Sequence, residues 1–161
     1  MVQENHPPLG MCIKNGIIYG DYMTSYSVMA VKKDGTIYTP AQGLMGKNLL
    51  AAGVKDTYNF GPVLIKDGEA QLPWAETEKY YPRTAVGMVK PNDYVLLVTD
   101  TGSYNGLNHW DMVNIFKSYG CTYAYNLDGG GSATLYFNGK VMNKLIGNTQ
   151  RPCADFLYFT R

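Results

Sequence analysis

One segment of the chain has residue types suited to ligand chemistry, Asn126-Leu-Asp-Gly-Gly-Gly-Ser132. It lies between two apolar stretches, 121–125 and 133–137, that we predict to be strands. A carboxylate at a strand end, followed by backbone without side chains, lets a ligand approach closely and presents amide N–H groups to an anion. This suits a sugar, a phosphate or both. The alternative is a glycine-rich hairpin with an Asx-type turn at Asp128.

A second carboxylate, Asp100, follows the predicted strand 93–99 and precedes Thr101-Gly-Ser103. Where a strand gives way to a loop, such a group is often catalytic or binds a ligand. Glycoside hydrolysis usually requires two carboxylates that face the same binding cleft. Asp100 and Asp128 could equally hold a hard cation such as Ca²⁺ or Mg²⁺. The sequence does not choose between these, and we assign no required cofactor.

Two arginines flank predicted strands in a chain whose cations are mostly lysines. Arg83 opens the predicted strand 84–90, and Arg151 precedes the predicted last strand, 154–159. Arginine in such positions suggests bidentate recognition of an anion. A surface salt bridge is an equally good interpretation of each arginine taken singly.

The two histidines, His6 and His109, show no Ser-His-Asp order and no metal-binding spacing. Hydrolysis through a serine nucleophile is therefore not expected. We interpret Ser132 as a hydroxyl donor to a ligand oxygen or as a residue that enters a strand.

Composition indicates one domain and excludes several classes of partner. The chain has 161 residues and a net charge of +1, and its longest basic cluster is the pair Lys32-Lys33. The sequence thus shows no cluster of positive charge that would attract nucleic acid or an anionic membrane. No apolar run reaches the roughly 18–20 residues that span a bilayer. The first residues lack the regions of a signal peptide, and localisation and oligomeric state stay open.

Tyrosine and cysteine each allow two interpretations. The 14 tyrosines suit either stacking on sugars or packing within strands. The three cysteines are too few for a zinc site or a disulfide framework. Cys121 and Cys153 lie in apolar, strand-like contexts, which predicts buried thiols. One disulfide with one odd thiol is the alternative.

The predicted elements form an α+β fold, a strand-rich single domain over residues 1–161 with two main helices and a flexible start at 1–8. The helices are expected at 44–52 and 108–119, each closed by a glycine. Asn108 caps the second helix, with Asp111 favoured in its first turn. The helical spacing of four apolar residues predicts core contacts, and these are Trp110, Val113, Phe116 and Tyr119.

The two halves of the chain repeat one order of elements: hairpin, helix and returning strand. Hairpins are expected at 27–38 and 84–99, and a Tyr-Asn pair follows each helix-ending glycine by five and six positions. The repeat is either an internal duplication or chance. If real, it places Asn59 and Asn126 at equivalent strand ends. The loops Gly61-Pro62 and Asp128-Gly129 would then face a shared cleft.

In series, these segments resemble the phosphodiester glycosidase family over roughly residues 9–159. The resemblance rests on Asn59-Phe-Gly-Pro-Val-Leu64 with Asp67-Gly68, Arg83-Thr-Ala-Val-Gly87, Asp100, Asn126–Ser132 and Arg151. Two departures stand out. Members usually carry an Asn/Gly-Gly-x-Phe-Phe stretch upstream of the segment matching 8–10, which we expect this chain to lack. The family also tends to have Asp-Gly-Arg where this chain reads Asp100-Thr-Gly102.

The resemblance implies hydrolysis of a sugar 1-phosphodiester at the glycosidic bond. It implies that Asp128 is the base or nucleophile and that Asp100 is its partner or a metal ligand. The implied contacts to phosphate and sugar oxygens are Arg83, Arg151, Asn59, Gly61, Asn126, Gly129, Gly130, Gly131 and Ser132. The rival hypotheses are a non-catalytic carbohydrate- or glycan-phosphate-binding module and a purely structural domain.

Overall fold

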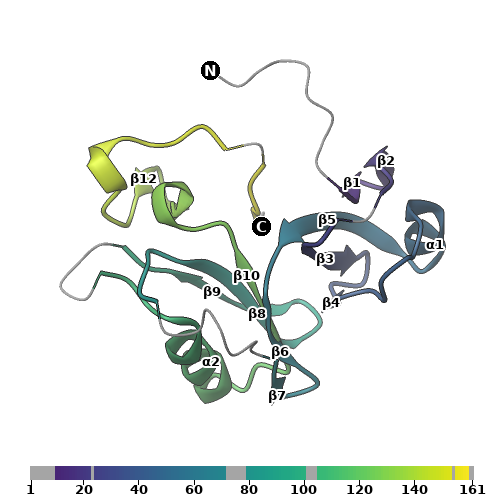
Figure 1. Ribbon diagram of the computed structural model, residues 1–161, viewed down its shortest axis with the longest axis horizontal. Helices are drawn as coiled ribbons and strands as arrows, with labels where there is room; N and C mark the ends of the chain where they lie inside the picture. The colour runs from purple at the N-terminus through teal and green to yellow at the C-terminus, as the bar shows by residue number, and fades with distance from the viewer. Residues whose placement is uncertain (1–9, 23, 72–78, 101–104, 154, 160–161) are drawn as a thin grey trace.

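A computed structural model describes residues 10–22, 24–71, 79–100, 105–153 and 155–159 (Figure 1). The predicted flexible start and the Thr101-Gly-Ser103 loop lie outside these residues. The first half contains β1 (Cys12–Lys14), β2 (Ile17–Gly20), β3 (Ser27–Lys32), β4 (Ile37–Tyr38), α1 (Gly46–Ala51) and β5 (Val54–Phe60). The second half contains β6 (Val63–Lys66), β7 (Glu69–Ala70), β8 (Thr84–Lys90), β9 (Asp93–Val98), α2 (His109–Ser118) and β10 (Tyr123–Leu127). An arm follows, with short 3₁₀ turns η1 (Gly130–Ser132) and η2 (Ile146–Asn148) around the hairpin β11 (Tyr136–Phe137) and β12 (Lys140–Val141).

The two halves share one sheet topology. The second sheet has the strand order β7-β6-β10-β8-β9, and the first has β4-β3-β5. The hairpin β1–β2 extends the first sheet beside β5, because Gly16 N–H donates to Lys55 O at 2.8 Å and Ile13 N–H to Thr57 Oγ1 at 2.8 Å. Both halves thus place a returning strand between two hairpins. The predicted repeat is confirmed in topology, and it includes a leading hairpin that was not anticipated.

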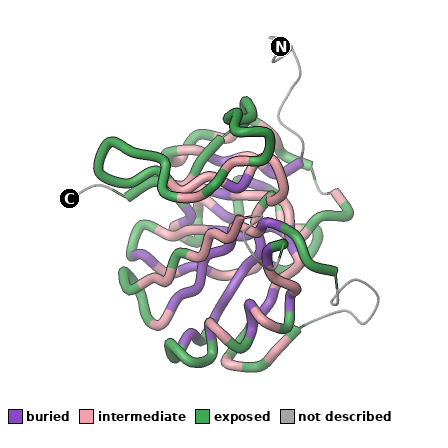
Figure 2. Tube along the Cα trace, turned by 90° about the vertical axis from the view of Figure 1, so that its left-hand side faces the viewer, coloured by how far each residue is buried: buried purple, intermediate pink, exposed green. Residues whose placement is uncertain are grey.

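The repeated units pack face to face, with each helix on the outside. The inner faces of the two sheets bury one shared cluster: Met29, Ile37, Val86, Met88, Tyr123 and Tyr125. The cluster under α2 includes Leu64, Ala85, Met112, Val113 and Phe116, and the cluster under α1 includes Ile13, Val28, Ala30, Leu49 and Val54. The layers therefore run α1, sheet, sheet, α2, and the buried residues lie mainly on the strands between the helices (Figure 2). This confirms the α+β prediction.

The buried face of α2 differs from the predicted one. Val113 and Phe116 are buried as expected, but Trp110 is 42% and Tyr119 63% exposed. His109 and Met112 take their places. The four buried residues follow the i, i+3, i+4, i+7 pattern of a single helical stripe, which Trp110 does not match. Tyr119 has the right spacing from Phe116 but is the C-cap, one position after the last helical residue, Ser118.

Three predicted strands also differ. The predicted strand 121–125 begins only at Tyr123, and 133–137 is reduced to Tyr136–Phe137, which follow the 3₁₀ turn η1 of the glycine run. Residues 155–159 form no strand in the described structure. They are held by side chains instead: Asp155 pairs with Lys14 at 2.8 Å, and the Phe159 ring lies 5.4 Å from that of Tyr94.

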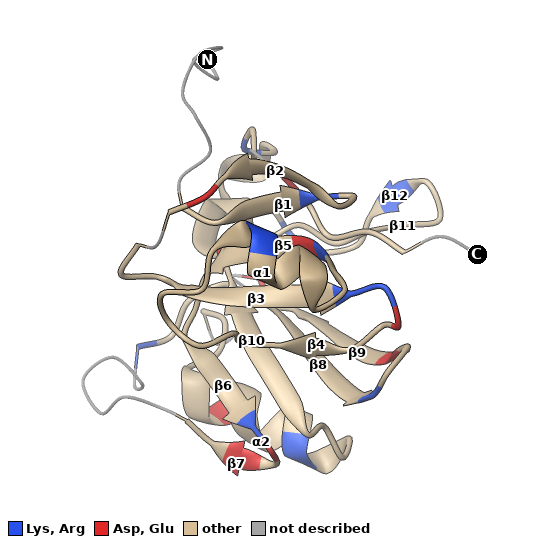
Figure 3. Cartoon of the chain, turned by 90° about the vertical axis from the view of Figure 1, so that its right-hand side faces the viewer, with Lys and Arg blue, Asp and Glu red and all other residues tan. Residues whose placement is uncertain are grey.

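Cys121 is buried as predicted, but Cys153 is exposed, because its segment is not a sheet strand. All three cysteines are free thiols in this structure. Burial raises the pKa of the Cys121 thiol. Charged residues are scattered over separate strands and loops (Figure 3). Among the described residues, no helix is both long enough and apolar enough to span a membrane.

Candidate active site

Three of the predicted site residues lie at one edge of the second sheet. Thr84, the first residue of β8, lies opposite Val98 at the end of β9 and opposite Leu127 at the end of β10. Arg83, Asp100 and Asp128 therefore flank three neighbouring strand ends. The antiparallel pairing explains this, since one strand begins at the edge where its two neighbours end.

The Asp128 side chain is exposed, and one of its oxygens, Oδ1, accepts the Gly129 N–H at 2.8 Å. The glycines that follow form η1 rather than the alternative hairpin. Since β10 ends at Leu127, the strand holds Asp128 by its backbone and leaves the carboxylate open to solvent. An exposed carboxylate at this position can act on a bound ligand.

The glycine run is needed for close backbone packing. A Cβ on Gly129 would lie 2.5 Å from Pro82 O, and Gly130, whose φ is 57°, donates its N–H to that same oxygen at 2.8 Å. The Gly129 and Gly130 amides are thus engaged within the protein. Gly131 is the glycine of the run that we associate with an anion, because it lies against an arginine.

That arginine is Arg151, which reaches the glycine run from the far side of the arm. A Cβ on Gly131 would lie 2.7 Å from its Nη2, and its Nη1 donates to Ser132 Oγ at 3.4 Å. Arg151 is exposed. A guanidinium beside a backbone segment without side chains is a suitable environment for a phosphate.

Arg83 is placed differently. Its Nε donates to Leu107 O at 3.1 Å and its Nη2 to Lys79 O at 2.9 Å, while its Cζ lies 5.2 Å from the centre of the Tyr81 ring. These contacts tie the segment before β8 to the segment before α2. The arrangement favours a positioning role over the direct phosphate contact that was expected.

Asp100 lines an open pocket of about 670 Å³ beside the N-terminus of α2. Its Oδ2 accepts the Lys144 N–H at 2.8 Å, so it also fastens the arm. The described lining residues are Tyr80, Val98, Thr99, Asp100, Gly106, Leu107, Asp111, Leu135, Met142 and Asn143, and Asp128 is not among them. Two strand spacings separate the Asp100 and Asp128 backbones by about 10 Å. The two carboxylates share an edge but not this pocket.

The two asparagines of the repeat hold equivalent backbone positions. Asn59 Nδ2 donates to Met11 O at 2.7 Å, and Asn126 Nδ2 donates to Gly61 O at 2.7 Å. Each amide fixes the residue that leads into the neighbouring strand. Because Asn126 is only 1% exposed, it can position the loop at Gly61 but cannot contact a ligand directly. Gly61 N–H donates to Asn126 O at 3.1 Å, and Asn126 N–H donates to Pro62 O at 3.1 Å, so the Gly61-Pro62 loop pairs with the end of β10. The described pocket lies on the Asp100 side, and a cleft shared by Gly61-Pro62 and Asp128-Gly129 stays a prediction.

In the part of the chain that the structure describes, no group of three or more His, Cys, Asp or Glu side chains could hold a metal ion.

Asn143 lies beside the candidate site and was not predicted from the sequence. Its Oδ1 accepts the Leu135 N–H at 2.7 Å, and its Nδ2 donates to Ala133 O at 2.9 Å. These bonds shape the arm over the pocket. No pattern in the sequence marks a single asparagine after a short hairpin for this role.

Comparisons with known proteins identify the family of this chain. A family model described as phosphodiester glycosidase matches residues 1–160. A SPbeta prophage-derived uncharacterized protein of Bacillus subtilis, YomE, is 30% identical over 166 residues, which cover 96% of this chain and 26% of that protein. N-acetylglucosamine-1-phosphodiester alpha-N-acetylglucosaminidase of Mus musculus is 28% identical over 156 residues, covering 81% of this chain and 29% of the enzyme.

Among solved structures, the catalytic domain of the zebrafish N-acetylglucosamine-1-phosphodiester alpha-N-acetylglucosaminidase, auto-inhibited by its pro-peptide, superimposes with a TM-score of 0.70. It is 24% identical, and the match covers 86% of this chain and 51% of that one. This likeness shows a shared fold. The chain spans little more than a quarter of the length of the two curated relatives, at 26% and 29%. The family match covers nearly the whole sequence, so this chain belongs to the phosphodiester glycosidase family.

Proposed function

We propose that this protein hydrolyses a sugar 1-phosphodiester at the glycosidic bond. The oxygen of water adds to the anomeric carbon, the bond from that carbon to the phosphate oxygen breaks, and a free sugar and a phosphate monoester leave. The observation that carries the proposal is the convergence of Asp128, Gly131, Ser132 and Arg151 at one strand end. Family membership supports the same reaction class.

The charges that develop on the phosphate and on the sugar determine the role of each residue. A phosphate monoester is a good leaving group, so strong protonation by a second carboxylic acid is less necessary than in ordinary glycoside hydrolysis. Negative charge develops on the phosphate, and we assign the Arg151 guanidinium and the Gly131 amide to it. Positive charge develops on the sugar ring, and we assign the Asp128 carboxylate to the anomeric carbon as base or nucleophile.

The remaining expected residues take supporting parts in this proposal. Ser132 Oγ already lies beside the Arg151 guanidinium and is assigned to a phosphate oxygen. Arg83 and Asn126 hold backbone segments. Asp100 serves the neighbouring pocket rather than the anomeric carbon, because it lies two strands away from Asp128.

The second candidate is a non-catalytic module that binds a sugar phosphate. The observation that favours it is that Asp128 does not line the described pocket to which Asp100 belongs, whereas glycosidases usually place two carboxylates on either side of one scissile bond. Binding without turnover would identify this case.

The deciding experiment is ³¹P NMR of the protein with α-sugar 1-phosphodiesters in ¹⁸O-labelled water, with and without a chelator. We expect conversion of diester to a monoester that carries no ¹⁸O in its phosphate, because the oxygen of water then goes to the anomeric carbon. Label in the phosphate would mean P–O cleavage and would overturn the role given to Asp128. A diester resonance that broadens without conversion would favour the binding module. Turnover lost only with chelator would add a metal to the site.

A further inference from the structure

Two aromatic rings lie nearly parallel where β3 begins and β5 ends. The ring centres of Tyr26 and Phe60 are 6.2 Å apart, and their planes differ by only 9°. Phe60 is the last residue of β5 and lies opposite Ser27, the first residue of β3, so Tyr26 directly precedes the paired strand. Tyr26 is 47% exposed, whereas Phe60 packs partly against the shared core. The pair therefore combines an exposed aromatic side chain with a ring anchored in the protein.

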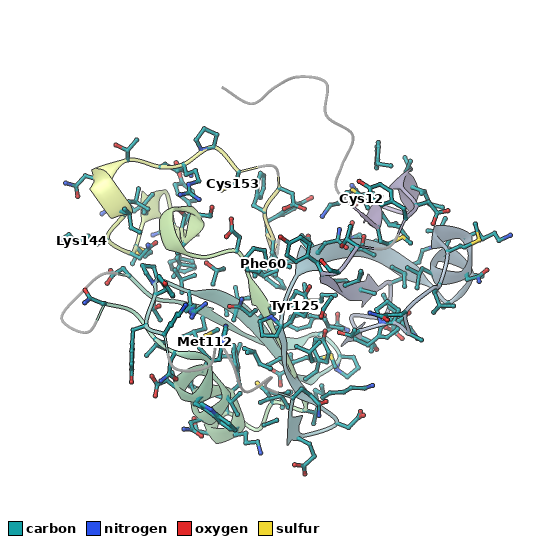
Figure 4. The ribbon with its side chains drawn as sticks, in the orientation of Figure 1. Cys12, Phe60, Met112, Tyr125, Lys144 and Cys153 are labelled. Carbon is teal, nitrogen blue, oxygen red and sulfur yellow. The ribbon has the colours of Figure 1, made fainter. Side chains whose placement is uncertain are left out.

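One buried hydroxyl fixes this pair relative to the proposed active site. Tyr125 Oη donates to Ser27 O and accepts the Phe60 N–H at 2.8 Å. Tyr125 is fully buried on β10, three residues before Asp128. Figure 4 shows Phe60 and Tyr125 where β5 and β10 approach each other. The strands that carry the aromatic pair are thus held to the strand that presents Asp128.

A backbone contact also links the pair to the strand that presents Asp128. Gly61 follows Phe60 and donates its N–H to Asn126 O at 3.1 Å. A Cβ on Gly61 would lie 3.2 Å from Ser27 Cβ, so this crossing from one sheet to the other is tight. Asp128 lies two residues beyond Asn126.

The chemistry of an aromatic face indicates what it would bind. Its π-electron face carries negative partial charge, so it is a poor site for a phosphate. It is a good site for the C–H face of a pyranose ring, which is apolar and weakly positive. Since Arg151 and Gly131 are assigned to the phosphate, the exposed aromatic pair complements them. We propose that Tyr26, backed by Phe60, stacks on the sugar ring of the substrate; this rests on the proposed function.

Steady-state kinetics can test the stacking. The probe substrate is the methyl phosphodiester of N-acetyl-α-glucosamine 1-phosphate. The variants are Tyr26→Ala, Tyr26→Phe as the ring-preserving control, and Tyr119→Ala as a control for an exposed tyrosine on α2. We expect KM to rise about tenfold in Tyr26→Ala with kcat little changed, because stacking binds ground state and transition state alike. Tyr26→Phe and Tyr119→Ala should keep the KM of the wild type. An unchanged KM in Tyr26→Ala would overturn the proposal.

Saturation-transfer NMR with the same probe separates this proposal from the proposed hydrolysis. The sugar ring protons should receive more saturation than the methyl phosphate protons, and Tyr26→Ala should remove that excess. Excess saturation that depends on Tyr26, without turnover by the wild type, would support the stacking and refute hydrolysis. Turnover with equal saturation of ring and methyl protons would keep hydrolysis and overturn the stacking. Absence of ring saturation in the wild type would likewise overturn it.

Discussion

Asp128 is the side chain on which the proposed chemistry depends most. It stands exposed at the end of β10, with one oxygen fixed by the Gly129 N–H. Asparagine preserves its shape but removes the negative charge and the basicity. We therefore expect Asp128→Asn to lower kcat by on the order of 10²–10⁴ if Asp128 acts as a general base.

The measurement is the initial rate of monoester release, followed by ³¹P NMR under substrate saturation. Asp67→Asn is the matched control, because Asp67 is an exposed carboxylate in the β6–β7 turn and its φ of 52° suits asparagine. Near-normal turnover in Asp128→Asn would contradict the assignment of Asp128.

Arg151 is expected to act on substrate binding. Its guanidinium lies against Gly131 and Ser132 and is exposed. Arg151→Lys keeps the charge but loses the planar fork that holds a phosphate by two bonds. We expect KM for the phosphodiester to rise by roughly tenfold or more, as a lost charge-assisted hydrogen bond costs about 1.5–3 kcal/mol.

Isothermal titration with inorganic phosphate provides an independent check on Arg151. Lys144→Ala is a suitable control because Lys144 contacts Asp100 through its backbone N–H, which alanine retains. Equal phosphate affinity in wild type and Arg151→Lys would remove Arg151 from the phosphate site.

At the scale of elements, Gly87 decides how closely α2 approaches its sheet. A Cβ there would lie 2.5 Å from Phe116 Cδ1 and 2.7 Å from Cys121 Sγ. Both neighbours belong to the buried cluster under the helix. We expect Gly87→Ala to lower the free energy of unfolding by about 1–3 kcal/mol through overpacking.

A double-mutant cycle measured by urea unfolding tests the cause of that loss. Phe116→Leu removes part of the ring that the new methyl group would meet. Gly87→Ala should therefore cost less in the Phe116→Leu background than in the wild type, giving a favourable coupling free energy. Additive effects of the two substitutions would refute the close-approach explanation.

The turns show which elements local chemistry specifies. Asn138-Gly139 and Asp67-Gly68 adopt the positive φ angles of two-residue hairpin turns. Asn15-Gly16 does the same between β1 and β2, and this dipeptide is the sequence signal for the hairpin that leads the first half of the chain.

At the scale of the whole molecule, buried tyrosines join the two sheets. Tyr123 Oη lies 2.7 Å from Thr39 Oγ1, and Tyr125 Oη bonds to the ends of β3 and β5. Burial is the main cause that raises the pKa of Tyr123 and of Tyr125. In the unfolded chain a tyrosine ionises near its ordinary pKa of about 10. Above that pH, the unfolded state binds fewer protons than the folded state.

The contribution of these two tyrosines to the free energy of unfolding should therefore be constant below about pH 9. It should fall as the pH rises beyond about pH 10. Each buried tyrosine contributes a slope of about 1.4 kcal/mol per pH unit. Urea unfolding between about pH 9 and about pH 11 measures this. Tyr123→Phe should flatten the slope, whereas Tyr119→Phe, at an exposed position on α2, should not. An unchanged slope in Tyr123→Phe would contradict the prediction.

The sequence by itself determined the local elements. Short apolar runs marked β8 and β9, the Asn108 cap and the closing Gly120 marked α2, and the Tyr-Asn pairs marked the repeat. These signals are local because hydrophobic periodicity, capping and turn chemistry depend on residues a few positions apart. The order of motifs also supplied the family.

Only the tertiary structure decided which site residues meet. It brought Arg151 onto Gly131, turned Arg83 and Asn126 toward backbone carbonyls, and placed the intervening strand β8 between the strand ends of Asp100 and Asp128. It also joined the aromatic pair to β10 through the Tyr125 hydroxyl. These relations link residues far apart in the chain. They follow from strand order and sheet packing, which local sequence patterns do not encode.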